Sequence, residues 1–304
     1  MTRIPTFYAF ERSLDAMNER RVALAQSQLQ LSTGRRVNAP SDDPLGAAQA
    51  ERARSQRARL GIERRMNDFA RTMLGQAESA MTGASDTLQG ARETLIAAGS
   101  GVLAPADRTM LAHALRAARD ELLSIANRPD GAGGYIFGGQ GSARAPFDAS
   151  GTLAWLPHAG EQSTGLDVPF TTSQDGRAVF VDLDDTGTRQ SIFQTIDDAI
   201  ALLDDASAPG DARAAGLGTA LNGVDAALGR LSLVRTRAGE QMRAIDSRER
   251  LIESGEIELS GRISDLVDAD YASTITRHQQ NQTALEAAMI TYAQVARSSL
   301  FQYL

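Results

Sequence analysis

Apolar residues at helical spacing define the first stretch of the chain. They recur every three or four residues from Phe7 to Leu31, which predicts an amphipathic helix with a narrow apolar face. This helix is expected to end near Thr33, because Gly34 suits the left-handed position that follows a helix C-terminus. The next residues, RRVNAPSDD, show no periodicity and contain a proline, which indicates a connecting segment.

Two further helices are predicted before residue 130. Asp43 can cap free N–H groups and Pro44 is tolerated at the first helical position, so a helix should begin there and continue to about Ala98. The segment GSGVLAPAD interrupts this pattern, and a third helix fits residues 106–127.

The C-terminal part of the chain carries the most regular pattern. A helix is predicted from about Ser191, and between Leu217 and Leu266 the apolar residues alternate at spacings of four and three. This spacing is typical of a coiled coil. The register slips near VDADYA and resumes from Ile275 to Tyr303. The slip indicates either a local change in supercoil or a boundary between two packing layers.

Residues 131–187 differ in composition from the helical segments, because they are rich in Gly and Pro. The runs GYIFGG, TLAWLP, DVPFTT and RAVFVDL are predicted to be strands separated by turns. Because helical patterns flank this segment on both sides, we expect a small β-rich insertion at one end of a helical bundle. Its removal is expected to leave the helices folded.

Composition narrows the class of protein. The chain has 304 residues, of which 42% are hydrophobic and only 5% aromatic, so its core must be built mainly from Ala, Leu, Ile and Val, which favours helix packing. The formal net charge of -7 argues against general nucleic-acid binding. The chain has no run of 18 apolar residues, so no membrane-spanning segment is predicted. The N-terminus lacks the apolar region of a cleaved signal peptide.

Candidate chemistry is sparse. The chain has no Cys and no Lys, which excludes disulfides, thiol chemistry and a P-loop lysine. The segment from Asp182 has part of a calcium-loop spacing, but Phe193 stands where the bidentate Glu would be. The run GAGGYIFGGQG opens no helix and does not fit a phosphate cradle. His113, His158 and His278 share no metal-ligand spacing. We therefore predict no catalytic, cofactor or metal site and no enzyme.

Opposite charges gather in two segments that the pattern places on helices. Residues 51–65 hold six Arg and two Glu, whereas residues 246–258 hold five acids and two Arg. We interpret the basic segment as a helix face beside an acidic neighbour, in the same chain or in the next one.

Motifs at both ends resemble the bacterial flagellin superfamily. The N-terminal motif is LSTGRRVNAPSDDPLGAAQA, and the C-terminal one is RISDLVDADYASTITRHQQNQTALEAAMITYAQVARSSLFQYL. Within the superfamily, PSDDP and GYIFGG are more similar to the members that join the flagellar hook to the filament than to filament flagellins. The resemblance covers about 130 residues at the N-terminus and 100 at the C-terminus.

The resemblance implies a structural protein that is mainly α-helical. Its terminal arms would pair as a long helical bundle or coiled coil, and the β-rich insertion would face outward. Five segments are implied: 1–43, an inner-layer helix and connector; 44–130, the first half of the bundle; 131–190, the insertion; 191–266, the second half of the bundle; and 267–304, the second inner-layer helix.

Two sets of residues follow from this comparison. The expected assembly interface is Phe7, Phe10, Leu14, Met17, Leu285, Met289 and Tyr292. The expected connector between the layers is Gly34, Asn38, Asp42, Asp43, Asp268, Asp270 and Tyr271. Two narrow apolar stripes leave other residues, such as Ile290 and Val295, uncovered by the intramolecular pair, so neighbouring copies are expected to cover them.

The implied partners are other copies of the chain in a ring or tube, hook-associated protein 1 on the hook side, flagellin on the filament side and an export chaperone. The implied location is the extracellular flagellum, reached through the flagellar type III apparatus without a cleaved signal. Two alternatives stay open. One is filament flagellin itself, and the other is a secreted coiled-coil protein whose β-rich segment binds a ligand.

Overall fold

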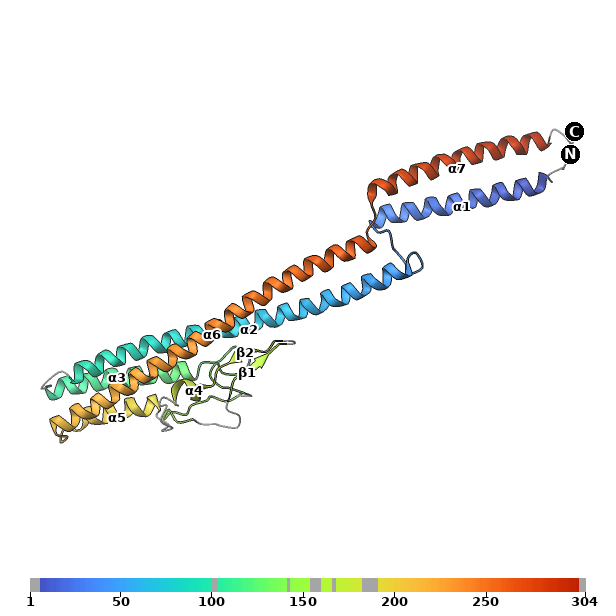
Figure 1. Ribbon diagram of the computed structural model, residues 1–304. Coiled ribbons are helices and arrows are strands. Elements are labelled where there is room, and N and C mark those ends of the chain that lie inside the picture. The colour runs from blue at the N-terminus through green and yellow to red at the C-terminus, as the bar shows by residue number, and fades with distance from the viewer. Residues whose placement is uncertain are drawn as a thin grey trace. The chain divides into compact units, whose positions relative to one another are not determined.

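The computed structural model of the chain is mainly helical (Figure 1). It describes residues 6–99, 103–140, 143–153, 160–165, 168–181 and 191–300. The elements, in chain order, are α1 (Thr6–Thr33), α2 (Pro44–Gly99), α3 (Pro105–Ala126), β1 (Gln162–Thr164), β2 (Phe170–Ser173), α4 (Gly176–Phe180), α5 (Ile192–Asp204), α6 (Gly210–Val267) and α7 (Tyr271–Leu300). This architecture confirms the predicted fold class of long helices with a small β-rich insertion.

The predicted helix boundaries are confirmed within a few residues. Gly34, directly after α1, has a φ of 69°, a left-handed conformation that glycine adopts without steric cost. At the start of α2, the Asp43 carboxylate accepts a hydrogen bond from the Gly46 N–H at 2.8 Å, which is the predicted N-terminal cap. The slip near VDADYA is a true break, because α6 ends at Val267 and α7 begins at Tyr271.

The chain divides into two compact units. Unit 1 comprises residues 1–60 and 253–304, and unit 2 comprises residues 61–252. The long helices α2 and α6 contribute residues to both units. The five-segment division remains a prediction.

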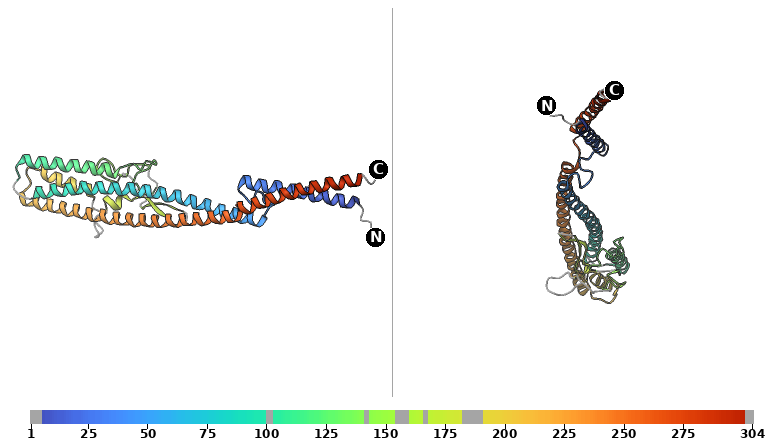
Figure 2. Two further views of the ribbon diagram at one scale, coloured as in Figure 1. Left: turned by 90° about the horizontal axis from the view of Figure 1, so that it is seen from above. Right: turned by 90° about the vertical axis from the view of Figure 1, so that its right-hand side faces the viewer.

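The core of unit 2 follows the heptad pattern of α6. One heptad position of this helix is buried at Leu217, Val224, Leu231, Ala238 and Ile245, and a second is buried at Ala220, Ala227 and Val234. Small residues of α2, including Ala70, Ala77 and Ala84, are also buried in this region, and small side chains allow helices to approach closely. Helices α3 and α5 pack beside one another (Figures 1 and 2). In contrast, the apolar residues Ile62 and Phe69 of α2 are largely exposed.

The β-rich insertion contains less sheet than the sequence predicts. Among the described residues of the insertion, only the strands β1 and β2 pair, as an antiparallel ribbon, so the DVPFTT prediction is confirmed for its last residues. GYIFGG forms isolated bridges and turns instead of a strand. RAVFVDL was predicted as a strand, but its first residues form helix α4, because Asp175 caps the Arg177 N–H and α4 buries Val179 and Phe180. TLAWLP lies partly outside the described residues, as does most of the calcium-like segment.

Four phenylalanines join the insertion to the helical core. Phe180 stacks edge-on against Phe137 and Phe147, with ring centroids 5.0 and 5.7 Å away, and lies 6.0 Å from Phe193 of α5. All four belong to the same buried cluster as the heptad residues of α6. The expectation that the insertion is separable from the bundle stays a prediction, and this packing argues against it, because its aromatic residues fill the core that the helices share.

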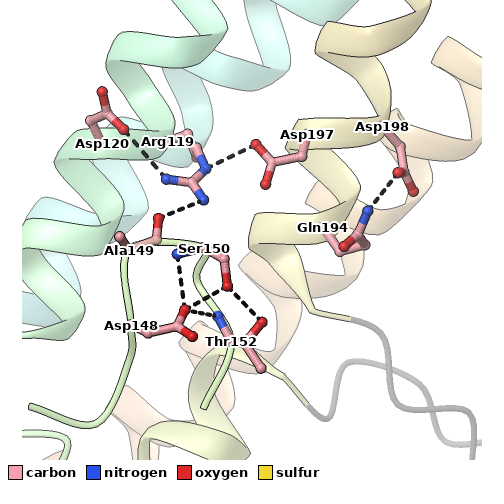
Figure 3. Close-up of polar contacts among 9 residues, drawn as sticks. All are labelled: Arg119, Asp120, Asp148, Ala149, Ser150, Thr152, Gln194, Asp197 and Asp198. Carbon is pink, nitrogen blue, oxygen red and sulfur yellow. Dashed lines mark hydrogen bonds and ion pairs between the residues drawn. The ribbon is translucent and has the colours of Figure 1, made fainter. Parts of the chain in front are cut away.

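Polar contacts also connect the insertion to helices α3 and α5 (Figure 3). The Arg119 guanidinium of α3 donates to Asp197 of α5 at 2.8 Å and to the Ala149 carbonyl of the insertion at 3.1 Å. The adjacent Asp148 carboxylate accepts from the hydroxyl and N–H of Ser150 and from the Thr152 N–H. These bonds, led by the Ser150 hydroxyl, lower the pKa of Asp148 and hold the turn that presents the Ala149 carbonyl.

Candidate assembly surface and connector

Helices α1 and α7 of unit 1 lie side by side and run in opposite directions (Figures 1 and 2). Two polar contacts define their register. The Ser27 hydroxyl lies 2.9 Å from His278 Nδ1, and Arg20 donates to the Asn281 side-chain oxygen at 3.2 Å. The predicted pairing of the two terminal arms is therefore present within one chain.

The interface between α1 and α7 is unusually polar. Among the side chains that the structure describes here, the buried ones are Ser27, Gln30, Thr274, Asn281 and Leu285. These polar groups are satisfied locally: Ser27 donates to the Leu24 carbonyl at 2.8 Å, and Gln30 donates to the Arg36 carbonyl at 3.0 Å. Because burying hydrogen-bonded polar groups contributes little net stability, the buried polar residues add little to the stability of the pair.

Several large apolar side chains of these helices are exposed, whereas Met17, Leu24 and Leu31 of α1 are half-buried. The exposed ones are Tyr8, Leu14, Val22 and Leu29 on α1, and Ile275, Met289 and Ile290 on α7. Tyr8, Val22 and Leu29 are separated by whole heptads, as are Ile275 and Met289, so each set forms one stripe along its helix. We call these residues the outer stripes. Contiguous exposed apolar surface is a common feature of interaction sites.

The predicted interface residues divide into three groups. Leu285 is buried, with 8% of its surface exposed, whereas Leu14 and Met289 are 37% and 39% exposed. Met17 and Tyr292 are half-buried. Phe7 and Phe10 lie in α1, but their side chains fall outside the described residues, as does that of Val295. The expectation that Ile290 is left uncovered within one chain is confirmed by its exposure of 63%.

A dilute monomer is expected to show weak hydrogen-exchange protection throughout α1 and α7. The polar interface and the exposed outer stripes do not offset the conformational entropy lost when the two helices order. Amides of the buried heptad positions of α6 should exchange far more slowly in the same sample. Strong protection of both arms at a concentration where the chain is monomeric would contradict this prediction.

The connector is built by backbone bonds between the outgoing and returning segments of unit 1. The Ala269 N–H donates to the Gly34 carbonyl at 2.9 Å, and the Arg36 and Val37 N–H groups both donate to the Val267 carbonyl, at 2.7 and 3.2 Å. An antiparallel bridge between Arg35 and Asp268 lies between these bonds. The two breaks in the helices, far apart in sequence, therefore form one structure, as the sequence comparison implied.

Acidic side chains of the connector each hold a turn. Asp42 accepts from the N–H groups of Asn38 and Ala39, both at 2.9 Å. Asp43 caps α2 and also contacts the Arg36 guanidinium at 3.3 Å. The Gly46 N–H, and after it Arg36, lower the pKa of the Asp43 carboxyl.

The returning segment uses the same chemistry. Asp270 caps α7 by accepting from the Ala272 N–H at 3.0 Å, and Asp268 accepts from the Ser264 hydroxyl at 2.6 Å. A side-chain carbon added to Gly34 would lie 2.9 Å from the Tyr271 hydroxyl oxygen, so Tyr271 covers the glycine turn. The predicted connector residues all lie in these two segments, and their role between two layers stays a prediction.

Sequence reasoning missed Arg36 and the polar interface residues. Arg36 donates to the Leu266 carbonyl at 2.6 Å and thereby joins the two segments. The sequence does show polar residues within the apolar pattern of α1, but it did not indicate that Ser27 and Gln30 would be the buried ones.

The paired terminal helices and the connector define a mainly helical protein whose two terminal arms pack together. Within the described residues, no helix is long and apolar enough to cross a membrane. The family model of the bacterial flagellin N-terminal helical region matches residues 6–142, and that of the C-terminal helical region matches residues 221–304. The chain belongs to the bacterial flagellin family.

Proteins similar to this chain match most or all of its length. The chain is 29% identical to flagellar hook-associated protein 3 of Salmonella typhimurium over 320 residues, covering 99% of both chains. Its fold is similar to that of a Vibrio parahaemolyticus chain assigned as a flagellar hook-associated protein, with a TM-score of 0.67, 19% identity and coverage of 75% and 100%. It is also similar to the flagellar junction protein of Legionella pneumophila, with a TM-score of 0.59, 16% identity and coverage of 72% and 100%. The chain is a structural component of the bacterial flagellum.

Proposed function

We propose that this protein is the adaptor that joins the flagellar hook to the filament, and that it assembles into a ring or tube through its α1 and α7 arms. Similarity to hook-associated protein 3 over 99% of both chains supports this position in the flagellum. The chain's partners are then other copies of itself, hook-associated protein 1 on the hook side and flagellin on the filament side.

The observation that carries the proposal is that polar residues are buried between the two arms while several apolar residues are exposed. Polar residues such as Ser27 and Asn281 are buried between α1 and α7, while Val22, Ile275 and Ile290 are exposed. A chain that functioned alone would gain by burying these apolar groups itself. In a ring or tube, neighbouring arms cover them, and the ordering of the arms is coupled to assembly.

Export precedes assembly in this account. The chain passes through the flagellar type III apparatus in an unfolded state, after release from an export chaperone, and reaches the extracellular flagellum. Arms with exposed apolar side chains suit this order of events, because they stay available until neighbours are present.

Deletion of the gene from its own organism tests the function. We expect hooks without filaments, flagellin released into the medium and loss of swimming, all restored when the gene is supplied again. Normal filaments in the deletion strain would overturn the proposal. Hooks that keep their terminal proteins while only the shaft is missing would identify the chain as filament flagellin, and an intact flagellum with loss of ligand binding would identify it as a secreted binding module.

A further inference from the structure

Two helical segments of unit 1 carry opposite charge. Residues 44–60 of α2 contain four Arg and one Glu, a net charge of +3, whereas residues 253–267 of α6 contain four acids and one Arg, a net charge of -3. The two segments pack together, because Gly255 contacts the Leu60 side chain and Ala50 shares a buried cluster with Val267. Unit 1 is therefore basic along one of these helices and acidic along the other.

Some of these charges are paired, as Arg54 is with Glu51, but four of them lie on the surface without an ion-pair partner among the described residues. Arg52 and Arg59 of α2, and Glu258 and Asp265 of α6, are exposed, and among the described residues none of the four forms an ion pair. Unit 2 differs, because Arg71 contacts Asp246 and Glu249 across the same two helices. Among the described residues of unit 1, Arg52, Arg59, Glu258 and Asp265 are thus exposed charges without an ion pair.

The spacing of the four residues matches between the two helices. Arg52 and Arg59 are one heptad apart, as are Glu258 and Asp265, so each pair lies along one stripe of its helix. In the antiparallel register set by Leu60 facing Gly255 and Ala50 packing near Val267, Arg59 stands level with Glu258 and Arg52 level with Asp265. Two copies placed side by side at the same height would bring a basic stripe level with an acidic one.

Each stripe also has an apolar residue beside it. Leu45 lies one heptad before Arg52 and is 69% exposed, and Ile257 precedes Glu258 and is 67% exposed. Charged groups around an exposed apolar residue are typical of the rim and the centre of a protein interface.

We propose that the α2 stripe of one copy, Arg52 and Arg59, docks on the α6 stripe of the next copy, Glu258 and Asp265; this rests on the proposed assembly. The opposite charges of the two stripes determine which stripes can face one another between copies. Contact between two α2 stripes or two α6 stripes, as in a two-fold dimer, opposes like charges, whereas α2 against α6 is attractive. A head-to-tail contact of this kind repeats around a ring.

Charge reversal tests the contact in a strain that lacks the native gene. Arg52→Glu with Arg59→Glu makes both stripes acidic, and Glu258→Arg with Asp265→Arg makes both basic. Like charges across an interface cost several kcal/mol, so each double variant should reduce hook-bound protein by about tenfold or more. Expressed together, or combined in one chain as a fourfold swap, they should restore binding. Melting of the purified variants should match that of the wild type, because all four positions are exposed.

A second readout does not depend on charge. The chain has no Cys, so a variant carrying Arg59→Cys and Glu258→Cys can be cross-linked on hooks with a bis-maleimide. A ladder of linked copies is expected, with at most dimers from either single-Cys variant.

Two outcomes separate this inference from the function on which it rests. Wild-type binding by either double variant, a fourfold swap no better than the doubles, or the absence of a ladder would overturn the contact while the wild-type chain is still found on hooks. If the wild-type chain itself is absent from hooks, the proposed function fails.

Discussion

Leu285→Asp is expected to leave secretion of the chain intact and to leave hooks without filaments. Leu285 is the buried apolar residue of the α1–α7 interface. Truncating a buried leucine costs about 2–5 kcal/mol, and burying an unpaired charge costs more. In a ring the loss recurs at every subunit. The type III channel passes unfolded chain, so export should not change, and the measurements are swimming, secreted protein and hook-bound protein.

Met289→Asp should give the same phenotype for a different reason. Met289 is 39% exposed in the single chain, so its replacement should barely change the stability of the monomer. Its contacts would be lost only where a neighbour covers the outer stripe. Gln280→Asp is the matched control, because it adds the same charge at an exposed polar position of α7, and it should swim normally. Normal motility with both Leu285→Asp and Met289→Asp would contradict the role of the arms.

Phe180→Ala is expected to destabilise the helical bundle, although Phe180 lies in the insertion. The side chain is 1% exposed and contacts Phe137, Phe147 and Phe193. Removing a buried Phe costs about 3–5 kcal/mol, because the cavity it leaves collapses only partly. The helical signal of the purified chain should therefore melt at a clearly lower temperature or denaturant concentration.

Phe69→Ala provides the comparison for this prediction. Phe69 is 45% exposed on α2, so the same change in chemistry should have a much smaller effect on the helical transition. Equal effects of the two substitutions, or a separate transition for the insertion in the wild type, would show that the insertion folds independently of the helices.

The helices could be predicted from the sequence because local signals agree with the tertiary structure. The cap at Asp43, the glycine turn at Gly34 and the heptads of α6 each specify a boundary or a face through neighbouring residues alone. The α6 heptads became the core of unit 2. The connector was predictable only through the family resemblance, since no local rule pairs Gly34 with Ala269.

The insertion and the arm interface were harder to predict for physical reasons. The apolar run around Phe180 suits a strand or a short helix, and contact with three other aromatic rings decided the outcome. In the arms, helical spacing located an apolar face. Whether this face packs against the other arm or is exposed depends on which residues of the other arm lie opposite it. Asn281 and His278 bind Arg20 and Ser27, and the apolar stripes were left outside.

Immunogold labelling of flagella sheared from cells tests the central claim most directly. An antibody against the chain should label a narrow band where the hook meets the filament, and the chain should be a minor species in the sheared material. Label along the whole filament shaft, with the chain as the main protein, would contradict the junction role.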